Sequence, residues 1–387
     1  MKIQDFELLS LFDRYLKMGN LTPAFLFEKR ILIKKAKEYL RAIENQDIKV
    51  KPFYAIKAND YLGILRTLVN LGFGLDASSG RELELAKKAK AKEVLFTGPG
   101  KTEGELYFGL KNFRNFIINV DSFGELERIK KLNFKREINI GVRINTKFQG
   151  KWERFGIPLK DLRKFFLKTR GKKIKLIGIQ FHSSWNQSSK IYIENLKILK
   201  NYLLKNFSFL DLKDLKFIDI GGGLYLNRME KYLKNKKGVW AQDINSFFRD
   251  IKNFYQRELK KTFPNIVIFT EPGRWLNSHC FHILLKVLDI KNKGLVILDG
   301  GTDNFGFSIN GKYYYPMINL SHPGKREKKV ILAGSLCSVY DIWGYEIFAS
   351  KIGIGDIILI PFQGAYTYSS ATDFIRPLPN VIELDVQ

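Results

Sequence analysis

A short apolar run followed by a charged, amphipathic stretch recurs along the first two thirds of the chain. Helix-like segments such as YLGILRTLVN and SFGELERIKKL separate most of the runs. The runs themselves are PFYAIK (52–57), LGFGLDA (71–77), EVLFTG (93–98), NFIINV (115–120), INIGVRIN (138–145), KLIGIQFH (175–182), KFIDIGGG (216–223) and NIVIFTEP (265–272). Strands that alternate with helices indicate a parallel sheet, and eight such units over about 200–250 residues predict an α/β chain with a (β/α)8 TIM barrel.

The pattern changes after Glu271. Short strand-like runs such as HILLKVLDI, GLVILDGG, KKVILAG and GDIILIPFQG follow one another with few helical segments between them. This spacing is typical of a mostly antiparallel β domain. TPAFLFEKR, near residue 22, is also strand-like, and pattern alone does not assign its sheet. We predict a barrel over residues 30–272 and a β domain formed by residues 1–29 together with 273–387.

The ends of the eight apolar runs carry the candidate chemistry. In a TIM barrel the active site lies at the carboxyl ends of the strands. A lysine that ends an apolar strand can instead simply reach solvent, but here polar residues or glycines end all eight runs. These residues are Lys57, Asp76, Thr97, Asn119, Arg143, His182, Gly221–Gly223 and Glu271.

Three of these positions suggest a particular cofactor. Gly221, Gly222 and Gly223 follow a strand directly, so their backbone N–H groups can approach a phosphate, although a tight turn would also use them. In TEPGRW, Glu271 could hold a proton on a heteroaromatic nitrogen with Arg274 near a phosphate, or the two could form an internal ion pair. A lysine, a glycine-rich cradle and an acid together fit pyridoxal phosphate, whose aldehyde forms a Schiff base with lysine. His182 could then lie flat on the ring.

The order of motifs along the chain resembles one family. PFYAIKAN, GFGLDASSGRELELA, LFTGPGKTEGEL, VDSFGELERI, RFGI, DIGGG, EPGRW, the Cys337 segment and GAYT occur in the order found in the fold-type III pyridoxal-phosphate decarboxylases. Diaminopimelate, ornithine and arginine decarboxylases belong to this family. The resemblance covers roughly residues 22–370. It implies a barrel of the alanine racemase type, a decarboxylase activity on α-amino acids and a homodimer with active sites at its interface.

The resemblance also implies roles for individual residues. Lys57 would be the Schiff-base lysine, with Glu271 as the partner of the pyridine nitrogen and His182 stacked on the ring. Cys337, in GSLCSVYD, would reach in from the other subunit to protonate the carbon that has lost CO2. The phosphate would be surrounded by Gly221–Gly223, Gly273, Arg274 and Tyr366, while Asp76 and Arg143 would support the lysine and the cofactor.

The sequence departs from the family pattern at its substrate end. After the sixth strand, Trp185 stands where the family commonly has a serine, and the usual FNG near the C-terminus is replaced by ATDFIRPLP. Many diamine-forming members have an acidic residue directly after the cysteine, where this chain has Ser338. Asp299 and Asp303 could contact a distal amine. We therefore expect a substrate other than ornithine, arginine or diaminopimelate, either an unusual amino acid or one tethered to a carrier protein.

Charge and cysteine content refine this picture. The 387 residues include 65 Lys and Arg against 39 Asp and Glu, a formal net charge of +26. The lysines are scattered, which indicates a solvated surface, with an acidic partner such as a carrier protein as the alternative and nucleic acid disfavoured. Two cysteines cannot build a disulfide framework, and no apolar segment resembles a signal peptide or a membrane span. We expect a cytoplasmic protein.

Two other functions and a metal site are alternatives to this interpretation. The first alternative is an amino-acid racemase on a similar barrel, which Glu271 disfavours because alanine racemases place an arginine at the pyridine nitrogen. The second is a basic binding protein without turnover. His279 and His282 form an H-x-x-H pair with no further ligands nearby, so no metal is expected.

Overall fold

The computed structural model describes residues 12–132, 134–146, 154–170, 173–184, 186–224, 241–307 and 315–384. These residues form two compact units, a barrel unit (33–224 and 241–275) and a β unit (12–32 and 276–384). Within the described ranges, every helix is too short or too polar to span a bilayer.

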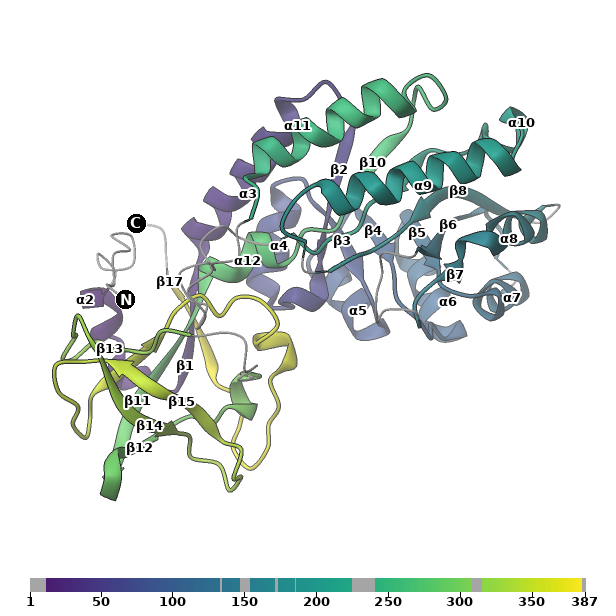
Figure 1. The fold of residues 1–387 in the computed structure, drawn as a ribbon. Coiled ribbons are helices and arrows are strands. Elements are labelled where there is room, and N and C mark those ends of the chain that lie inside the picture. The colour runs from purple at the N-terminus through teal and green to yellow at the C-terminus, as the bar shows by residue number, and fades with distance from the viewer. Residues whose placement is uncertain are drawn as a thin grey trace. The chain divides into compact units, whose positions relative to one another are not determined.

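The barrel unit is a closed sheet of parallel strands with helices around its outside (Figure 1). The strands follow one another around the barrel in chain order, and β5 pairs with β6 to close the circle; β7 (Ile157–Pro158) pairs in parallel with the end of β6. They are β2 (Val50–Ala55), β3 (Gly74–Ala77), β4 (Glu93–Phe96), β5 (Asn115–Val120), β6 (Ile138–Asn145), β8 (Ile174–Gln180), β9 (Phe217–Asp219) and β10 (Val267–Thr270). The predicted eight-stranded barrel is confirmed.

The surrounding helices begin where the sequence supplies capping residues. The side chains of Ser79, Thr102 and Ser122 each accept a hydrogen bond from a backbone N–H in the first turn of the helix that follows, which satisfies a donor that the helix itself leaves unpaired. The helices are α3 (Lys29–Glu44), α4 (Leu62–Asn70), α5 (Gly80–Lys88), α6 (Glu103–Asn112), α7 (Phe123–Lys131), α8 (Leu162–Thr169), α9 (Lys190–Asn206), α10 (Phe209–Leu212) and α11 (Ile244–Phe254).

A layer of apolar side chains fills the barrel interior. The rings of Phe217 and Phe269 stack with their centroids 4.3 Å apart, and Phe53 packs against Phe269. Gly141 and Gly178 make room for this layer, because a Cβ atom at these positions would approach the ring of Phe217 to 3.0 and 2.0 Å. We call Phe53, Leu95, Ile177, Phe217 and Phe269 the aromatic floor.

The polar residues of the barrel lie one layer nearer the carboxyl ends of the strands. Side chains two residues apart on a strand face the same side. In this layer Leu95, Ile117, Phe217 and Phe269, together with Gly74 and Gly141, are each followed two positions later by a polar side chain. These polar residues are Asp76, Thr97, Asn119, Arg143, Asp219 and Glu271, all of them buried, and we call them the polar layer.

The β unit is an eight-stranded sheet in the order β12-β14-β15-β13-β16-β11-β1-β17. It is mostly antiparallel, as predicted, and only the pairs β1–β17, β12–β14 and β13–β15 are parallel. Its strands are β1 (Ala24–Glu28), β11 (Phe281–Lys291), β12 (Leu295–Leu298), β13 (Ile318–Asn319), β14 (Glu327–Ala333), β15 (Ile342–Phe348), β16 (Ile357–Ile360) and β17 (Asn380–Leu384). The TPAFLFEKR segment forms β1, which pairs with β11 and β17.

Two short helices belong to the remaining segments of the chain. In the β unit, α2 (Phe12–Leu16) precedes β1, and Tyr15 on this helix donates a hydrogen bond of 3.0 Å to buried Glu28. α12 (Arg274–Asn277) begins directly after the Glu271 segment. The core of the β unit includes Tyr15, Leu26, Leu284, Phe348 and Leu359.

Candidate active site

Lys57 lies just beyond β2. The strand ends at Ala55, and Lys57 is on the 3-10 turn η2 (Ile56–Ala58), so the sequence interpretation placed the end of the strand two residues too far along. Its Nζ atom is 2.9 Å from Oδ2 of Asp76, on the neighbouring strand β3. Asp76 is fully buried, and burial raises the pKa of its carboxyl to about 6 although Lys57 acts in the opposite direction.

Glu271 follows β10 and points into the polar layer. Its Oε1 accepts a hydrogen bond of 3.1 Å from Nε2 of Gln180, and its Oε2 is 3.4 Å from Nδ1 of His182. Burial acts to raise the pKa of Glu271, but His182, Lys57 and Arg143 together lower it to about 2. Glu271 is therefore a carboxylate at neutral pH.

His182 follows β8 and contacts both Glu271 and the glycine loop. Its Nδ1 accepts a hydrogen bond of 3.2 Å from the backbone N–H of Gly222, and its Nε2 is 3.1 Å from Oγ of Ser184. Because burial lowers the pKa of His182, the neutral ring accepts from Gly222.

The loop of Gly221, Gly222 and Gly223 follows β9 and leaves no room for side chains. Gly221 and Gly223 have φ angles of +72° and +94°, in the left-handed region that favours glycine. A Cβ atom on Gly222 would lie 2.2 Å from the carbonyl oxygen of Glu271, and one on Gly223 would lie 2.3 Å from that of Ser183. Gly273 is similarly close to Ala58. These glycines let backbone come close to backbone, as a phosphate cradle requires.

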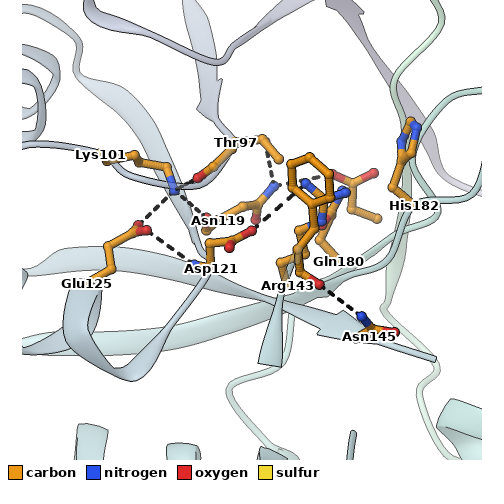
Figure 2. A network of polar contacts seen from close by, with 12 residues as sticks. Thr97, Lys101, Asn119, Asp121, Glu125, Arg143, Asn145, Gln180 and His182 are labelled. Carbon is orange, nitrogen blue, oxygen red and sulfur yellow. Dashed lines mark hydrogen bonds and ion pairs between the residues drawn. The ribbon is translucent and has the colours of Figure 1, made fainter. Parts of the chain in front are cut away.

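Arg143 and a buried lysine complete a polar network on the same side of the barrel (Figure 2). The guanidinium of Arg143 lies 3.9 Å from Asp121 and over the ring of Phe155. Lys101 donates to Glu125 at 2.8 Å and to the carbonyl oxygens of Gly98 and Asn119. The Lys101–Glu125 ion pair thus ties the loop after β4 to the first turn of α7.

These residues fit pyridoxal phosphate. The site offers an amine, a carboxylate that stays ionised and a glycine loop from which any Cβ would be excluded. Two buried polar atoms, Nε of Arg143 and Oδ1 of Asp76, have no hydrogen-bond partner in the described part of the chain. Groups of this kind usually find partners in folded proteins, so both can serve a bound polar ligand.

Several predicted site residues lie in the β unit. Cys337 is an exposed free thiol, Ser338 is half-buried, Asp303 is exposed, and Tyr366 is half-exposed with a φ angle of +63°. Asp299 is half-buried, and its Oδ1 accepts from the backbone N–H of Lys286. Arg274, at the start of α12, is half-buried. Trp185 lies outside the described residues.

The structure adds residues that the sequence interpretation missed. Gln180 and Asp219 lie within apolar runs and were counted as parts of strands, although their two-residue spacing from inward-facing neighbours would have placed them in the polar layer. Asp341 organises the Cys337 turn: its carboxylate accepts from the backbone N–H groups of Thr302 (2.7 Å) and Leu336 (2.8 Å). Its position four residues after the cysteine gave no local signal.

Comparison with known proteins identifies the family. Residues 30–278 match the family model for the pyridoxal-dependent decarboxylase, pyridoxal binding domain. The chain is 28% identical to diaminopimelate decarboxylase of Methanocaldococcus jannaschii, over 83% of this chain and 75% of that protein. It is 26% identical to the L-glutamyl–acyl-carrier-protein decarboxylase of Niallia circulans, over 94% and 88%.

Similarity to solved structures supports the same family. A point variant of diaminopimelate decarboxylase from Helicobacter pylori, crystallised with L-lysine, matches with a TM-score of 0.81 and 25% identity over 94% of this chain and 92% of that one. Decarboxylation, rather than racemisation or binding without turnover, is the reaction that this family carries out on its amino-acid substrates with pyridoxal phosphate. The chain belongs to the fold-type III pyridoxal-dependent decarboxylases and is an amino-acid decarboxylase that uses pyridoxal phosphate.

Proposed function

We propose that Lys57 is the residue that holds the cofactor and that Glu271 is its partner at the ring nitrogen. The observation that supports this most directly is the position of the Lys57 amine, 2.9 Å from buried Asp76, at the end of the barrel that also holds ionised Glu271. When bound, pyridoxal phosphate supplies an aldehyde that binds amines and a ring that withdraws electrons from the bond to the departing carboxylate.

The surrounding residues would orient the cofactor and keep it charged. Asp76 holds the Lys57 ammonium in place, and the Glu271 carboxylate keeps a proton on the ring nitrogen. His182 would cover one face of the ring, and Arg143 would support the cofactor. Gly221–Gly223, Gly273, Arg274 and Tyr366 would bind the phosphate.

We further propose a homodimer of the enzyme in which residues 30–272 act as the cofactor-binding domain and residues 1–29 with 273–387 complete the active site. Cys337 of the partner subunit would give a proton to the carbon that has lost CO2, which yields the amine. Asp299, Asp303 and Ser338 would face the distal end of the substrate. With both cysteines free, a reducing compartment such as the cytoplasm suits the enzyme.

We infer that the substrate differs from the common diamine precursors. Ser338 provides no charge for a distal ammonium group, and the formal net charge of +26 favours an acidic partner. A relative acts on an amino acid carried by an acyl-carrier protein. An amino acid tethered to an acidic carrier is therefore the substrate class that we put first, ahead of an unusual free amino acid.

A panel of substrates tests this function. Purified enzyme loaded with pyridoxal phosphate is given free and carrier-linked amino acids, and CO2 release is measured at low and high salt. We expect faster turnover of a carrier-linked substrate, with a kcat/KM that falls as salt screens the encounter. Equal turnover of a free amino acid, unaffected by carrier or salt, would remove the carrier proposal. CO2 release that survives in Glu271→Arg would refute the role given to Glu271.

A further inference from the structure

Asp219 is a buried acid that the proposed chemistry does not use. It is the last residue of β9, two positions after Phe217, so its side chain points into the barrel directly above the aromatic floor. It is fully buried. A carboxyl group so enclosed must be paired with a cation or be neutral, because an isolated buried charge is very costly.

Asp219 links the glycine loop to Glu271. Its Oδ1 accepts a hydrogen bond of 2.9 Å from the backbone N–H of Gly221, whose own carbonyl oxygen accepts 2.9 Å from the backbone N–H of Glu271. The Asp219 carboxyl also lies within hydrogen-bonding reach of the Glu271 carboxyl. Two carboxyl groups this close share a proton, since two adjacent negative charges repel.

The other neighbours of Asp219 do not neutralise it as a carboxylate. Among the described residues no ion pair involves Asp219, whereas Asp76 is paired with Lys57 and Asp121 with Arg143. Asn119 on β5 is 3.4 Å away through Nδ2. The charged groups that face Asp219 from other elements are Asp76 on β3, Arg143 on β6 and Glu271 after β10. Arg143 thus faces Glu271, Asp121 and Asp76 as well as Asp219, and within the described ranges Asp219 has no ion pair of its own.

The proton of this carboxyl pair belongs on Asp219. Burial raises the pKa of Asp219 well above its usual range, and the neighbouring Glu271 charge raises it further, while the pKa of Glu271 is lowered. Oδ1 already accepts from Gly221, so Oδ2 is the oxygen that can carry the proton and donate it to Glu271. The hydroxyl oxygen can still accept from Asn119.

We propose that Asp219 is a positioning residue that acts as a neutral carboxylic acid, donating a hydrogen bond to Glu271 while it anchors Gly221. This inference rests on the proposed role of Glu271, because it explains how Glu271 is held in one orientation as the only charged member of the pair. It also explains how the Gly221–Gly223 loop and Glu271 keep a fixed position relative to each other, since the Asp219 side chain binds both.

Infrared difference spectroscopy of the full-length protein tests the protonation directly. Spectra are taken at about pH 8, where exposed carboxyl groups are ionised, and the spectrum of each variant is subtracted from that of the wild-type protein. We expect the stretching band of a protonated carboxyl group, shifted in D2O, in the wild-type protein. The band should be missing in Asp219→Asn and retained in the matched variant Asp76→Asn.

Cofactor affinity tests the positioning role. Asparagine can accept from Gly221 and donate to Glu271, and the Asn119 amide can flip to meet it, so Asp219→Asn should retain most of the affinity for pyridoxal phosphate. Asp219→Ala loses both bonds, and its affinity should fall by about tenfold or more. Melting curves of each variant show which ones fold.

The outcomes separate this inference from the proposed function. A band that persists in Asp219→Asn, or that is absent in the wild-type protein, would overturn the proposal, as would equal affinity losses in the two Asp219 variants. Because the infrared measurement needs no turnover, it stands even if Glu271 proves to have another role. Loss of the band in Asp219→Asn together with full activity of Glu271→Gln would instead count against the proposed function alone.

Discussion

The Lys57 ammonium and the Asp76 carboxylate lie 2.9 Å apart because two neighbouring strands align in a fixed register. Ala55 on β2 pairs with Asp76 on β3, and the turn that follows β2 carries Lys57 back over its neighbour. Asp76 therefore provides a fixed negative charge beside an amine whose side chain is 36% exposed. The Lys57–Asp76 pair therefore sets the position in the barrel of the amine that we propose binds the cofactor.

Replacing Lys57 with alanine should abolish covalent attachment of the cofactor. No other described lysine amine lies beside the buried Asp76–Glu271 pair, so no substitute for Lys57 is at hand. The absorbance band of attached cofactor should disappear, along with CO2 release, while Lys88→Ala on the exposed face of α5 should behave as wild type. A band that persists in Lys57→Ala would mean that another lysine holds the cofactor.

Cofactor loading should depend on pH through Asp76. Its pKa is raised to about 6, so the carboxyl is ionised above that pH and neutral below it. The rate at which cofactor-free protein takes up pyridoxal phosphate should fall as pH drops through about 6, because a neutral Asp76 no longer holds the ammonium. Asp76→Asn should load slowly with no such dependence. A wild-type rate that stays flat through this range would contradict the assignment.

The same shift predicts how stability changes with pH. The folded state binds the Asp76 proton more tightly than the unfolded chain does, whose pKa is close to 3.8. Between about 3.8 and about 6, the contribution of Asp76 therefore lowers the free energy of unfolding as pH rises. Urea denaturation of wild-type protein and Asp76→Asn across this window should give different slopes. Parallel slopes would show that Asp76 titrates at its ordinary pKa.

The buried Lys101–Glu125 pair should matter for stability. Both side chains are almost fully enclosed, and Lys101→Met would leave the Glu125 charge without its partner. We expect a loss of about 3–5 kcal/mol in urea denaturation. The double variant Lys101→Met with Glu125→Leu should recover part of it, but not all, because the carbonyl oxygens of Gly98 and Asn119 stay unpaired.

A surface pair provides the control for this experiment. Lys130 and Glu127 are also 2.8 Å apart, three residues from each other on α7, but Glu127 is half-exposed. Lys130→Met should leave the midpoint of unfolding unchanged, because solvent-exposed pairs contribute little. Equal effects at the two sites would show that burial does not set the importance of Lys101.

Substrate choice should respond to the residue after Cys337. Ser338 accepts a hydrogen bond from the backbone N–H of Tyr340 through its hydroxyl oxygen, and an aspartate could preserve that bond. Ser338→Asp should raise kcat/KM for an amino acid with a distal ammonium group by about tenfold, through a new charge-assisted hydrogen bond. Ser338→Asn, equal in size but neutral, should not. The same gain in both variants would argue against a charge contact at this position.

The barrel strands were predictable because each is a local apolar run that ends in a polar residue. Asp76, Arg143, His182 and Glu271 were found this way and all lie at one end of the barrel unit. The exact end of β2 was not predictable, because hydrophobicity does not distinguish a final strand residue from a 3-10 turn such as the one that carries Lys57.

Other features depend on contacts between distant parts of the chain. β17 is short and partly exposed, and it forms a strand because it pairs with β1, near the other end of the sequence. Gln180 and Asp219 look like polar interruptions of apolar strands until the neighbouring floor residues show which side they face. The role of Asp341 depends on the Thr302 turn, which is distant in sequence and lies within hydrogen-bonding distance of it.

The stacked rings of Phe217 and Phe269, with Phe53 beside them, fill the interior of the barrel unit one layer below the polar layer. The packing around these rings is tight, because a Cβ atom at Gly178 would collide with the ring of Phe217. Molecules therefore cannot pass through the cylinder. Substrate, carbon dioxide and product amine must therefore all pass through the carboxyl-end opening of the barrel. A side chain that narrows this opening will slow both substrate binding and product release.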